Sequence, residues 1–354
     1  MNKKSIIKRI WSVLLIFLLV FSLVNVSVVS DTQAASTSLS KHGRLSVKGA
    51  DLVDKNGKKF QLRGISTHGI NWDVGEPYVN KAAFKTLRDK WGVNAVRLAM
   101  YTEEYNGYCT GGDKAKLRAL VDNGVKYAKE LGMYAIIDWH VLKEGNPNAH
   151  LNEAKDFFTI MAKKHKNDKN VIYEICNEPN GGASWSDIKS YAKQVIKTIR
   201  NYDKKAVIIV GTPTWSQLGS DGTSNEVADG PITGFKNIMY TLHFYAGEWS
   251  HNEYLPKKVE YARKKKLPIM VTEFGLSPAS GDGDISTGNA DKWFKLLDKY
   301  NISYFCWSLS NKNESASLLA PSTSKKSGWK NSDLSAAGKY IKKEYVKRKK
   351  KAGI

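Results

Sequence analysis

Cysteine is scarce in this sequence of 354 residues, which contains only three. Such an odd and small set does not suggest a disulfide framework, and no pair has the spacing of a zinc site. Cys176 and Cys306 lie inside apolar stretches, so we expect them to be buried as small hydrophobic side chains. We therefore expect neither a disulfide-stabilised fold nor a structural metal.

Long apolar runs are absent beyond the first 30 residues. The single run, residues 11–29, follows a start that bears Lys and Arg and precedes small residues. This layout is typical of a secretory signal peptide, and Thr32 and Ala34 predict cleavage after Ala34, with Ala35 close behind. An uncleaved membrane anchor is the alternative, because the run is just long enough to span a bilayer. The small-residue site and the lack of a positive flank after it favour cleavage, secretion and no stable membrane insertion.

Acidic residues are few, with 34 Asp and Glu against 55 Lys and Arg, and the formal net charge is +21. Residues 1–34 hold four basic residues and one acidic residue, hence +3, which leaves +18 for the rest. The lysines are scattered through helix-like segments, and no nucleic-acid-binding motif accompanies them. We expect a solvated basic exterior and no nucleic-acid partner. Association with an anionic cell-wall polymer, through the run "IKKEYVKRKKKAGI", stays open.

Internal repeats, low-complexity segments and Pro/Ser/Thr-rich linkers are also absent. We therefore divide the chain into a signal peptide (1–34), a short linker (35–45), one large domain (46–342) and a basic tail (343–354). We expect this chain to be a monomer.

Short apolar runs alternate with amphipathic helical patterns along the domain, eight times in all. Strands alternating with helices predict a parallel sheet, and eight units over some 300 residues predict a (β/α)₈ barrel. A doubly wound open sheet is the alternative, but it requires a Gly-rich phosphate turn after the first strand, which "GISTHGINW" does not offer. The expected strands are 61–66, 93–98, 133–138, 171–176, 206–210, 238–242, 269–272 and 304–308. The expected helices are 80–91, 113–131, 151–165, 184–201, 224–229, 253–265, 288–300 and 333–346.

A β-hairpin is expected before the barrel. The stretch "LSVKGADLVDKNGKKF" alternates in polarity around Asn56-Gly57, a dipeptide that favours tight turns. We expect this hairpin to close the bottom of the barrel.

Polar and aromatic side chains follow nearly every expected strand at its carboxyl end. In a (β/α)₈ barrel these ends share one rim, and the active site lies there. Singly, each such residue is more simply explained by packing or solvation, but their concentration on one rim predicts a binding site. The residues are His68, Trp72, Arg97, Tyr101, His140, Asn177, Glu178, Trp215, His243, Tyr245, Glu273, Trp307, Lys312 and Glu314.

Two of these residues carry the chemistry that we expect. The segment "YEICNEPNG" ends the fourth strand with Glu178, and "TEFG" ends the seventh with Glu273, so the two carboxyl groups face each other across the mouth. Such a pair hydrolyses glycosidic bonds when one group is protonated and the other is charged. Glu174 and Asp138 are rival carboxylates, which we interpret as structural residues inside the barrel.

The neighbouring residues suit the same chemistry. Arg97 is expected to keep Glu273 ionised, and Asn177 to hydrogen-bond a sugar 2-hydroxyl. His243 and Tyr245 are expected to orient the two carboxylates. The flat faces of Trp72, Trp215 and Trp307 match the apolar faces of pyranose rings, and Lys312 and Glu314 can bind hydroxyl groups.

The motifs "DWH" (138–140), "YEICNEP" (173–179), "HFY" (243–245) and "VTEFG" (271–275), with Arg97 and Trp307, resemble glycoside hydrolase family 5. The segments "GISTHGINW" and "NKNE" are similar to its bacterial endo-β-1,4-glucanase (cellulase) branch. The resemblance runs from about residue 40 to 340 and implies a (β/α)₈ barrel with a retaining mechanism.

The resemblance also implies roles for the matching residues. Glu178 becomes the acid/base and Glu273 the nucleophile. The subsite where the bond breaks is completed by Arg97, His140, Asn177, His243, Tyr245 and Trp307. The glycon-side residues are His68, Trp72, Lys312 and Glu314, and Trp215 stacks on the aglycon side. Tyr101 is a further substrate-binding candidate.

The expected activity is therefore a secreted endo-β-1,4-glucanase that needs no cofactor or metal and acts on a β-1,4-glucan. Mannanase, xylanase and mixed-linkage glucanase activities stay open, because hydroxyl orientation at each subsite decides among them. A non-catalytic glycan-binding protein is the alternative from another class, although both carboxylates are present.

Overall fold

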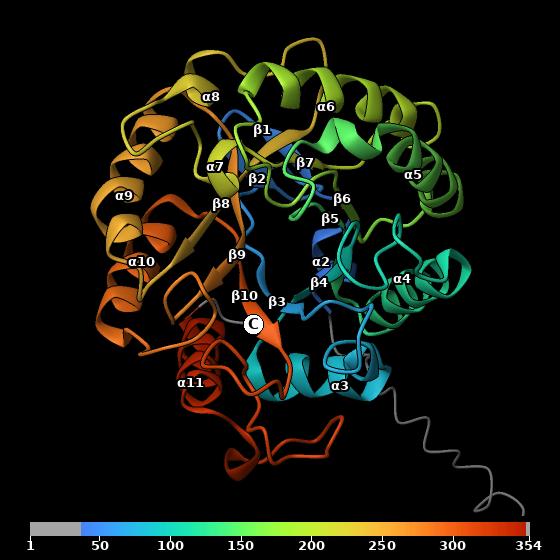
Figure 1. Cartoon of the computed structure of the whole chain (residues 1–354). Coiled ribbons are helices and arrows are strands. Elements are labelled where there is room, and N and C mark those ends of the chain that lie inside the picture. The colour runs from blue at the N-terminus through green and yellow to red at the C-terminus, as the bar shows by residue number, and fades with distance from the viewer. Residues whose placement is uncertain (1–36, 352–354) are drawn as a thin grey trace, which may run out of the picture. The chain divides into compact units, whose positions relative to one another are not determined.

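Eight parallel strands close into a barrel in this computed structural model, which describes residues 37–351. Each strand pairs with the next in chain order, and β10 pairs with β3 to close the ring. Figure 1 looks along the barrel, with the helices around it. The strands are β3 (Arg63–Thr67), β4 (Ala95–Tyr101), β5 (Tyr134–His140), β6 (Val171–Glu174), β7 (Ile208–Val210), β8 (Ile238–Tyr245), β9 (Ile269–Gly275) and β10 (Tyr304–Leu309). The predicted (β/α)₈ barrel is confirmed.

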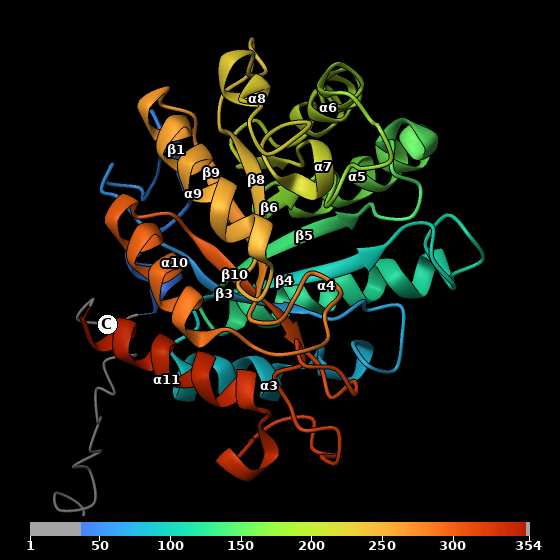
Figure 2. The same ribbon diagram turned by 60° about the vertical axis from the view of Figure 1, so that its left-hand side comes forward.

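Helices cover the outside of the barrel, as Figure 2 shows from the side. Their apolar faces and the outer faces of the strands form the main hydrophobic core. The larger helices are α3 (Lys81–Thr86), continued by a π-helical segment (Leu87–Trp91), α4 (Lys114–Glu130), α5 (Leu151–His165), α6 (Trp185–Arg200), α9 (Trp249–Lys264), α10 (Thr287–Tyr300) and α11 (Ala336–Lys351). Shorter segments are α2 (Ser38–His42), α7 (Pro213–Ser216), α8 (Glu226–Asp229) and the 3₁₀ turns Glu76–Tyr78, Pro147–His150 and Asn331–Asp333.

The expected hairpin forms, but its principal turn differs from the prediction. Strands β1 (Ser46–Lys48) and β2 (Asp51–Val53) pair antiparallel across a turn at Gly49, whose φ of 60° suits glycine. The Asn56-Gly57 turn only joins Val53 to Lys59 through an isolated bridge. Leu45, Leu52 and Phe60 pack against residues at the amino ends of the barrel strands. The hairpin therefore closes the barrel end opposite the expected site.

Both segments that flank the expected catalytic domain contain helix. Within the expected linker, α2 begins after a capping box at Thr37, and the Leu39 amide donates to the Gly132 carbonyl at 2.9 Å. Helix α11 continues to Lys351, beyond the expected end at 346. The fully buried Tyr345 donates its hydroxyl to the Gly64 carbonyl at 2.9 Å, so tertiary packing stabilises this part of the basic tail.

Strands β4, β8 and β9 each extend three residues beyond their predicted ends. His243 and Glu273, which lie just beyond the predicted bounds 238–242 and 269–272, face each other in the β8–β9 ladder. Backbone pairing therefore holds these side chains on strands rather than on loops.

The predicted signal peptide lies outside the described residues. Between residues 37 and 351, no helix combines the length and apolar character needed to cross a bilayer.

Candidate active site

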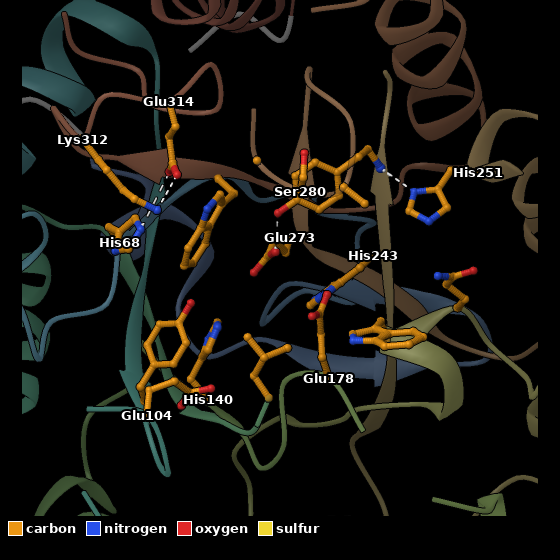
Figure 3. A pocket seen from close by; sticks show the side chains of 18 of the residues that line it. His68, Glu104, His140, Glu178, His243, His251, Glu273, Ser280, Lys312 and Glu314 are labelled. Carbon is orange, nitrogen blue, oxygen red and sulfur yellow. Dashed lines mark hydrogen bonds and ion pairs between the residues drawn. The ribbon is translucent and has the colours of Figure 1, made fainter. Parts of the chain in front are cut away.

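A cleft of about 620 Å³ opens at the carboxyl ends of the strands. Figure 3 shows the side chains that line it. Twelve of the fourteen predicted site residues form its walls: His68, Trp72, Tyr101, His140, Glu178, Trp215, His243, Tyr245, Glu273, Trp307, Lys312 and Glu314. The other two, Arg97 and Asn177, have no exposed surface and lie beneath the two carboxylates.

Glu178 and Glu273 approach each other across this cleft. Glu273 lies on β9 with its side chain 6% exposed, and Glu178 follows β6 with its side chain 13% exposed. One carboxylate oxygen of each lies within 4.8 Å of the other and of a His243 ring nitrogen. Retaining glycosidases hold their two carboxyl groups about 5–5.5 Å apart, whereas inverting ones leave about 6.5–9.5 Å for a water. An approach of the two oxygens to within 4.8 Å is consistent with the closer, retaining arrangement.

A single buried cation organises the floor of the site. The guanidinium of Arg97, on β4, contacts Glu273 at 3.1 Å, Glu174 at 2.7 Å and Asp138 at 3.0 Å. Its Nη2 also donates to Oδ1 of Asn177 at 2.5 Å. The contact with Glu174 confirms that residue as an internal ion-pair partner. A planar donor fork of this kind can hold several acceptors in fixed positions, which a flexible Lys cannot do.

Each carboxylate has its own orienting partner. The Tyr245 hydroxyl donates to Oε1 of Glu273 at 2.7 Å, so Glu273 is held by both Tyr245 and Arg97. Oε1 of Glu178 contacts Nδ1 of His243 at 2.7 Å. Both aromatic residues lie on β8, where backbone pairing with β9 places His243 opposite Glu273 and Tyr245 opposite Gly275.

The environment of Glu178 favours its protonated form. Burial raises the pKa of Glu178 to about 8; Arg97 opposes this rise, and the Asp138 and Glu174 charges add to it. Burial also lowers the pKa of His243 to about 4, so this ring is neutral near pH 7. A carboxyl group that is protonated at neutral pH can act as a general acid.

Asp138 and His140 form a second pair on the floor of the cleft. Nδ1 of His140 lies 2.6 Å from Oδ2 of Asp138, and burial lowers the pKa of His140 well below its ordinary value. Burial raises the pKa of Asp138 to about 7, against the opposing charge of Arg97. The Asn177 amide nitrogen contacts Nε2 of His140 and the Val141 carbonyl, both at 3.2 Å. Both polar atoms of the Asn177 amide group therefore contact other protein groups, the oxygen Arg97 and the nitrogen His140 and Val141.

Aromatic rings line one end of the cleft in a continuous series. The ring centroid of Trp307 lies 5.5 Å from that of His140, on which it stacks, and 5.1 Å from that of His68. The ring centroids of Tyr101 and Trp72 are 4.5 Å apart. At the same end Nζ of Lys312 contacts Glu314 at 2.5 Å, and His68 lies 3.8 Å from Glu314. Alternating ring faces and charged groups suit a sugar, which has apolar ring faces and polar edges.

Trp215 lies at the other end of the cleft and is 47% exposed. It belongs to α7, where its φ of 53° is left-handed, and its amide donates to the Pro179 carbonyl at 3.0 Å. The same backbone contact ties the Trp215 loop to the segment that carries Glu178. The two ends thus offer ring faces on either side of the two carboxylates.

Several lining residues were not predicted from the sequence, namely Glu104, Leu142, Gln217, His251, Ala279, Ser280 and Gly281. They lie in loops or at the start of a helix, where no periodicity marks them. Their only signal is position, because each follows a strand at the same rim. Thr272, which contacts His243 beneath the cleft, was also missed because it reads as an ordinary strand residue.

Within residues 37–351, two groups of side chains come close enough to share a cation. Glu178, His243 and Glu273 form one group, and Glu103, Glu144 and His150 form another near the rim. The first group consists of the two facing carboxylates and a histidine that contacts one of them. Hydrolysis by two carboxylates requires no metal, so the absence of a cofactor requirement stays a prediction.

Known proteins similar to this chain in sequence and in fold include cellulases and endoglucanases. The family described as cellulase (glycosyl hydrolase family 5) matches residues 53–313. An endoglucanase from Clostridium saccharobutylicum is 45% identical over 314 residues, which are 88% of this chain and 66% of that relative. Endoglucanase A from Butyrivibrio fibrisolvens is 42% identical over 306 residues, which are 86% of this chain and 68% of the relative. The chain thus spans about two thirds of these relatives.

A solved structure extends the comparison to a bound sugar. The catalytic domain of a Thermobifida fusca endoglucanase, crystallised as a variant in complex with cellotetraose, is 35% identical with a TM-score of 0.81. The alignment covers 88% of this chain and 99% of that domain.

Proposed function

This chain belongs to glycosyl hydrolase family 5, and from that membership we propose that it is an endo-β-1,4-glucanase with a retaining mechanism. The observation that carries the proposal is the pair of carboxylates, Glu178 and Glu273, whose nearest oxygens lie within 4.8 Å in an open, aromatic-lined cleft. The endoglucanase relatives and the cellotetraose bound to one of them support a β-1,4-glucan as substrate.

In the first step Glu178 acts as the acid and Glu273 as the nucleophile. Glu178 gives its proton to the glycosidic oxygen while Glu273 attacks the anomeric carbon, so the C–O bond to the leaving chain breaks as a new C–O bond to Glu273 forms. The hydrogen bonds from Arg97 and Tyr245 hold the Glu273 carboxylate in place for this attack. The leaving chain departs with the proton of Glu178.

In the second step a water molecule releases the sugar. The ionised Glu178 now takes a proton from the water, whose oxygen attacks the anomeric carbon and displaces Glu273 as a carboxylate. Two inversions give a product with the original β configuration. Glu178 ends protonated and Glu273 ends ionised, so the enzyme returns to its starting state.

The remaining wall residues would bind the sugar chain. We assign His68, Trp72, Lys312 and Glu314 to the glycon side and Trp215 to the aglycon side. Tyr101, His140, His243 and Trp307 would surround the sugar at the cleavage point. Because Arg97 and Asn177 are fully buried, we propose that they position these groups from below.

Hydrolysis of carboxymethyl-cellulose tests the proposal directly. The expected result is a rapid loss of viscosity with few new reducing ends, because cuts within a chain shorten it far more than cuts at its ends. NMR of fresh products from a soluble cello-oligosaccharide should show the β anomer first. Mannan, xylan and mixed-linkage glucan should be tested in parallel to decide among the related activities. Glycan binding without cleavage of any of these polymers would instead favour a non-catalytic binding protein.

We further propose that the protein is secreted, with residues 1–34 as its signal peptide, and that it acts as a monomer without a nucleic-acid partner. A specific surface supports association with an anionic polymer outside the cell. Helix α11 contains eight basic residues and one acidic residue. Its exposed lysines recur every three or four positions, so they form one row about 16 Å long: Lys339, Lys343, Lys347 and Lys350.

A second row of lysines runs beside the first. This second row belongs to α10, which packs beside α11. The Tyr340 hydroxyl of α11 donates to Asp291 of α10 at 2.7 Å, and Arg348 of α11 contacts Asp298 of α10 at 3.0 Å. Arg348 neutralises Asp298, whereas the Tyr340 hydroxyl only hydrogen-bonds Asp291. The exposed lysines of α10 are Lys292, Lys295 and Lys299. We call this pair of rows the basic flank. Helices α10 and α11 lie on the outside of the barrel (Figure 2), so a polymer bound to the flank would leave the cleft open.

Charge reversal tests the basic flank. A variant with Lys339, Lys343 and Lys347 changed to Glu should bind soluble linear polyphosphate roughly tenfold or more weakly at low salt, because fewer counter-ions are released. Its activity on a small aryl cellobioside should be unchanged. The matched control changes three exposed lysines of α5 and α6, far around the barrel (Figure 1): Lys163, Lys193 and Lys197. Equal losses of affinity in both variants would show that only net charge matters. That result would contradict the proposal that the basic flank is the binding surface.

A further inference from the structure

A chain of hydrogen bonds runs from Glu178 into the barrel through a residue to which no role has been assigned. Oε1 of Glu178 lies 2.7 Å from Nδ1 of His243, and Nε2 of His243 lies 2.9 Å from the Thr272 hydroxyl. That hydroxyl donates to Oε1 of Glu174 at 2.6 Å. We propose that Thr272 is a positioning residue, which fixes the tautomer of His243 and thereby keeps Glu178 protonated for the first step.

The direction of each hydrogen bond follows from counting protons. Glu174 is paired with Arg97 at 2.7 Å and accepts as a carboxylate. Thr272 has one hydroxyl hydrogen and gives it to Glu174, so toward His243 it can only accept. Nε2 of His243 must therefore carry the ring proton. In a neutral imidazole the other nitrogen is then an acceptor, and Nδ1 presents a lone pair to Glu178.

A lone pair on Nδ1 decides which form of Glu178 is favoured. The protonated carboxyl group donates to Nδ1, whereas the ionised carboxylate would face this lone pair with its own. Hydrogen bonding to the neutral form of an acid disfavours its ionisation. This tautomer of His243 thus favours the protonated form of Glu178, as burial of the carboxyl group also does. It also helps Glu178 recover a proton from water in the second step, which returns the acid to its starting form.

Thr272 reaches the acid Glu178 through His243. It lies on β9 next to Glu273, is fully buried, and does not line the cleft. Its hydroxyl contacts His243, which lines the cleft, and Glu174, which does not. The other titratable or charged groups around Glu178 and His243 come from five strands and one helix: Tyr101 and Arg97 on β4, Asp138 and His140 on β5, Glu174 on β6, Tyr245 on β8, His251 on α9 and Glu273 on β9.

Removal of the Thr272 hydroxyl should reverse the tautomer. In Thr272→Val the Nε2 proton would point at a methyl group without an acceptor, and a buried unpaired N–H is costly. The ring should then carry its proton on Nδ1 and donate it to Glu178. This donation stabilises the ionised carboxylate, so Glu178 should lose its proton at lower pH. The titratable and charged groups around Glu178 and His243 keep their covalent structure in this variant.

The chain offers a matched control on the neighbouring strand. Thr241, on β8, is also fully buried, and its hydroxyl lies 3.5 Å from the same Glu174 oxygen. Among the contacts of residues 37–351, none joins the Thr241 hydroxyl to His243. Thr241→Val therefore removes a buried hydroxyl near Glu174 without touching the tautomer. Thr272→Ser keeps the hydroxyl and serves as the conservative variant.

The experiment measures kcat/KM against pH on an aryl cellobioside with a poor leaving group, which needs the acid. This test rests on the proposed function. Thr272→Val should move the alkaline limb down by about one pH unit. Thr241→Val and Thr272→Ser should keep the wild-type limb. An unchanged limb in Thr272→Val would overturn the proposal, and so would an equal shift in Thr241→Val.

A spectroscopic measurement tests the hydrogen-bond chain Glu178–His243–Thr272–Glu174, here called the relay, without using activity. Long-range ¹H–¹⁵N NMR distinguishes the two imidazole tautomers, and a His243→Asn variant identifies the signals of this ring. The wild type should show a proton on Nε2, and Thr272→Val should show it on Nδ1. A wild-type proton on Nδ1 would overturn the relay even in an active enzyme. A wild type that cleaves no glycan but shows the expected tautomers would overturn the proposed function and leave the relay standing.

Discussion

Glu273→Gln should lose turnover of every β-glucan while it keeps its fold and its affinity for the chain. An amide oxygen is a poor nucleophile, so the glycosyl-enzyme cannot form, and kcat should fall by roughly 10⁴-fold or more. The side chain keeps its partners. Its oxygen can accept from Arg97, and its amide group can donate to Tyr245, whose hydroxyl both donates and accepts. The measurements are kcat on carboxymethyl-cellulose and calorimetric titration with cellotetraose.

Azide provides the stereochemical control for this variant. In Glu273→Ala the space vacated by the carboxylate can admit azide, which attacks the anomeric carbon from the nucleophile's side and gives an α-glycosyl azide from an activated aryl cellobioside. Near-normal turnover of Glu273→Gln without azide would contradict the assignment. A β-glycosyl azide from Glu273→Ala would instead assign Glu273 as the acid/base. The test therefore identifies the face of the sugar on which Glu273 acts.

The barrel was predictable because burial on both faces leaves a clear pattern in the sequence. Parallel strands between helices read as short apolar runs, and these located all eight strands. Their carboxyl ends were less predictable. His243 and Glu273 are strand residues that pair across the β8–β9 ladder, yet a polar side chain at a strand end looks like the start of a loop. The ends of β4, β8 and β9 were therefore placed three residues too early.

The site was predictable in its members but not in its contacts. The two glutamates and the aromatic residues could be located because strand ends in a closed barrel converge on one rim. The fan of contacts from Arg97 to Asp138, Glu174 and Glu273 depends on barrel closure and register, which a linear pattern does not contain. Gln217, His251 and Ser280 come from loops and a helix start, where no periodicity identifies a lining residue.

The burial of Asn177 also illustrates the limit of position alone. Its place next to Glu178 in the chain suggested a side chain in contact with sugar. The structure instead turns the side chain down toward Arg97 at 2.5 Å, because that guanidinium has more donors than the three carboxylates use. Neighbouring residues at a strand end point in different directions, so one of them faces the cleft and the other faces the barrel.

Glu178→Ala should separate the two chemical steps by their need for an acid. On carboxymethyl-cellulose the rate should fall by about 10²–10⁴-fold, because the departing sugar alcohol needs a proton. A 2,4-dinitrophenyl cellobioside has a leaving group that departs without one, so its first step should stay fast and the glycosyl-enzyme should accumulate. A burst of dinitrophenol followed by slow turnover is the expected signal. Equal loss on both substrates would argue against Glu178 as the acid.

The pH profile gives a second signature of the same residue. The pKa of Glu178 is raised to about 8 by burial, so its acid form is present below pH 8 and is lost as the pH rises through that value. Wild-type kcat/KM on a substrate with a poor leaving group should therefore fall on the alkaline side near pH 8. In Glu178→Ala this limb should vanish. A limb that persists unchanged would assign it to another group.

Azide should restore Glu178→Ala and complete the assignment by its product. With the acid/base removed and Glu273 intact, the glycosyl-enzyme forms on the α face, and azide then attacks from the opposite side. The product should be a β-glycosyl azide, the opposite of the α-azide expected from Glu273→Ala. The two variants differ only in which of two neighbouring carboxylates is missing, so opposite anomers cannot arise from a general loosening of the cleft. They require Glu178 and Glu273 to act on opposite faces of one sugar, as the approach of their oxygens to within 4.8 Å allows.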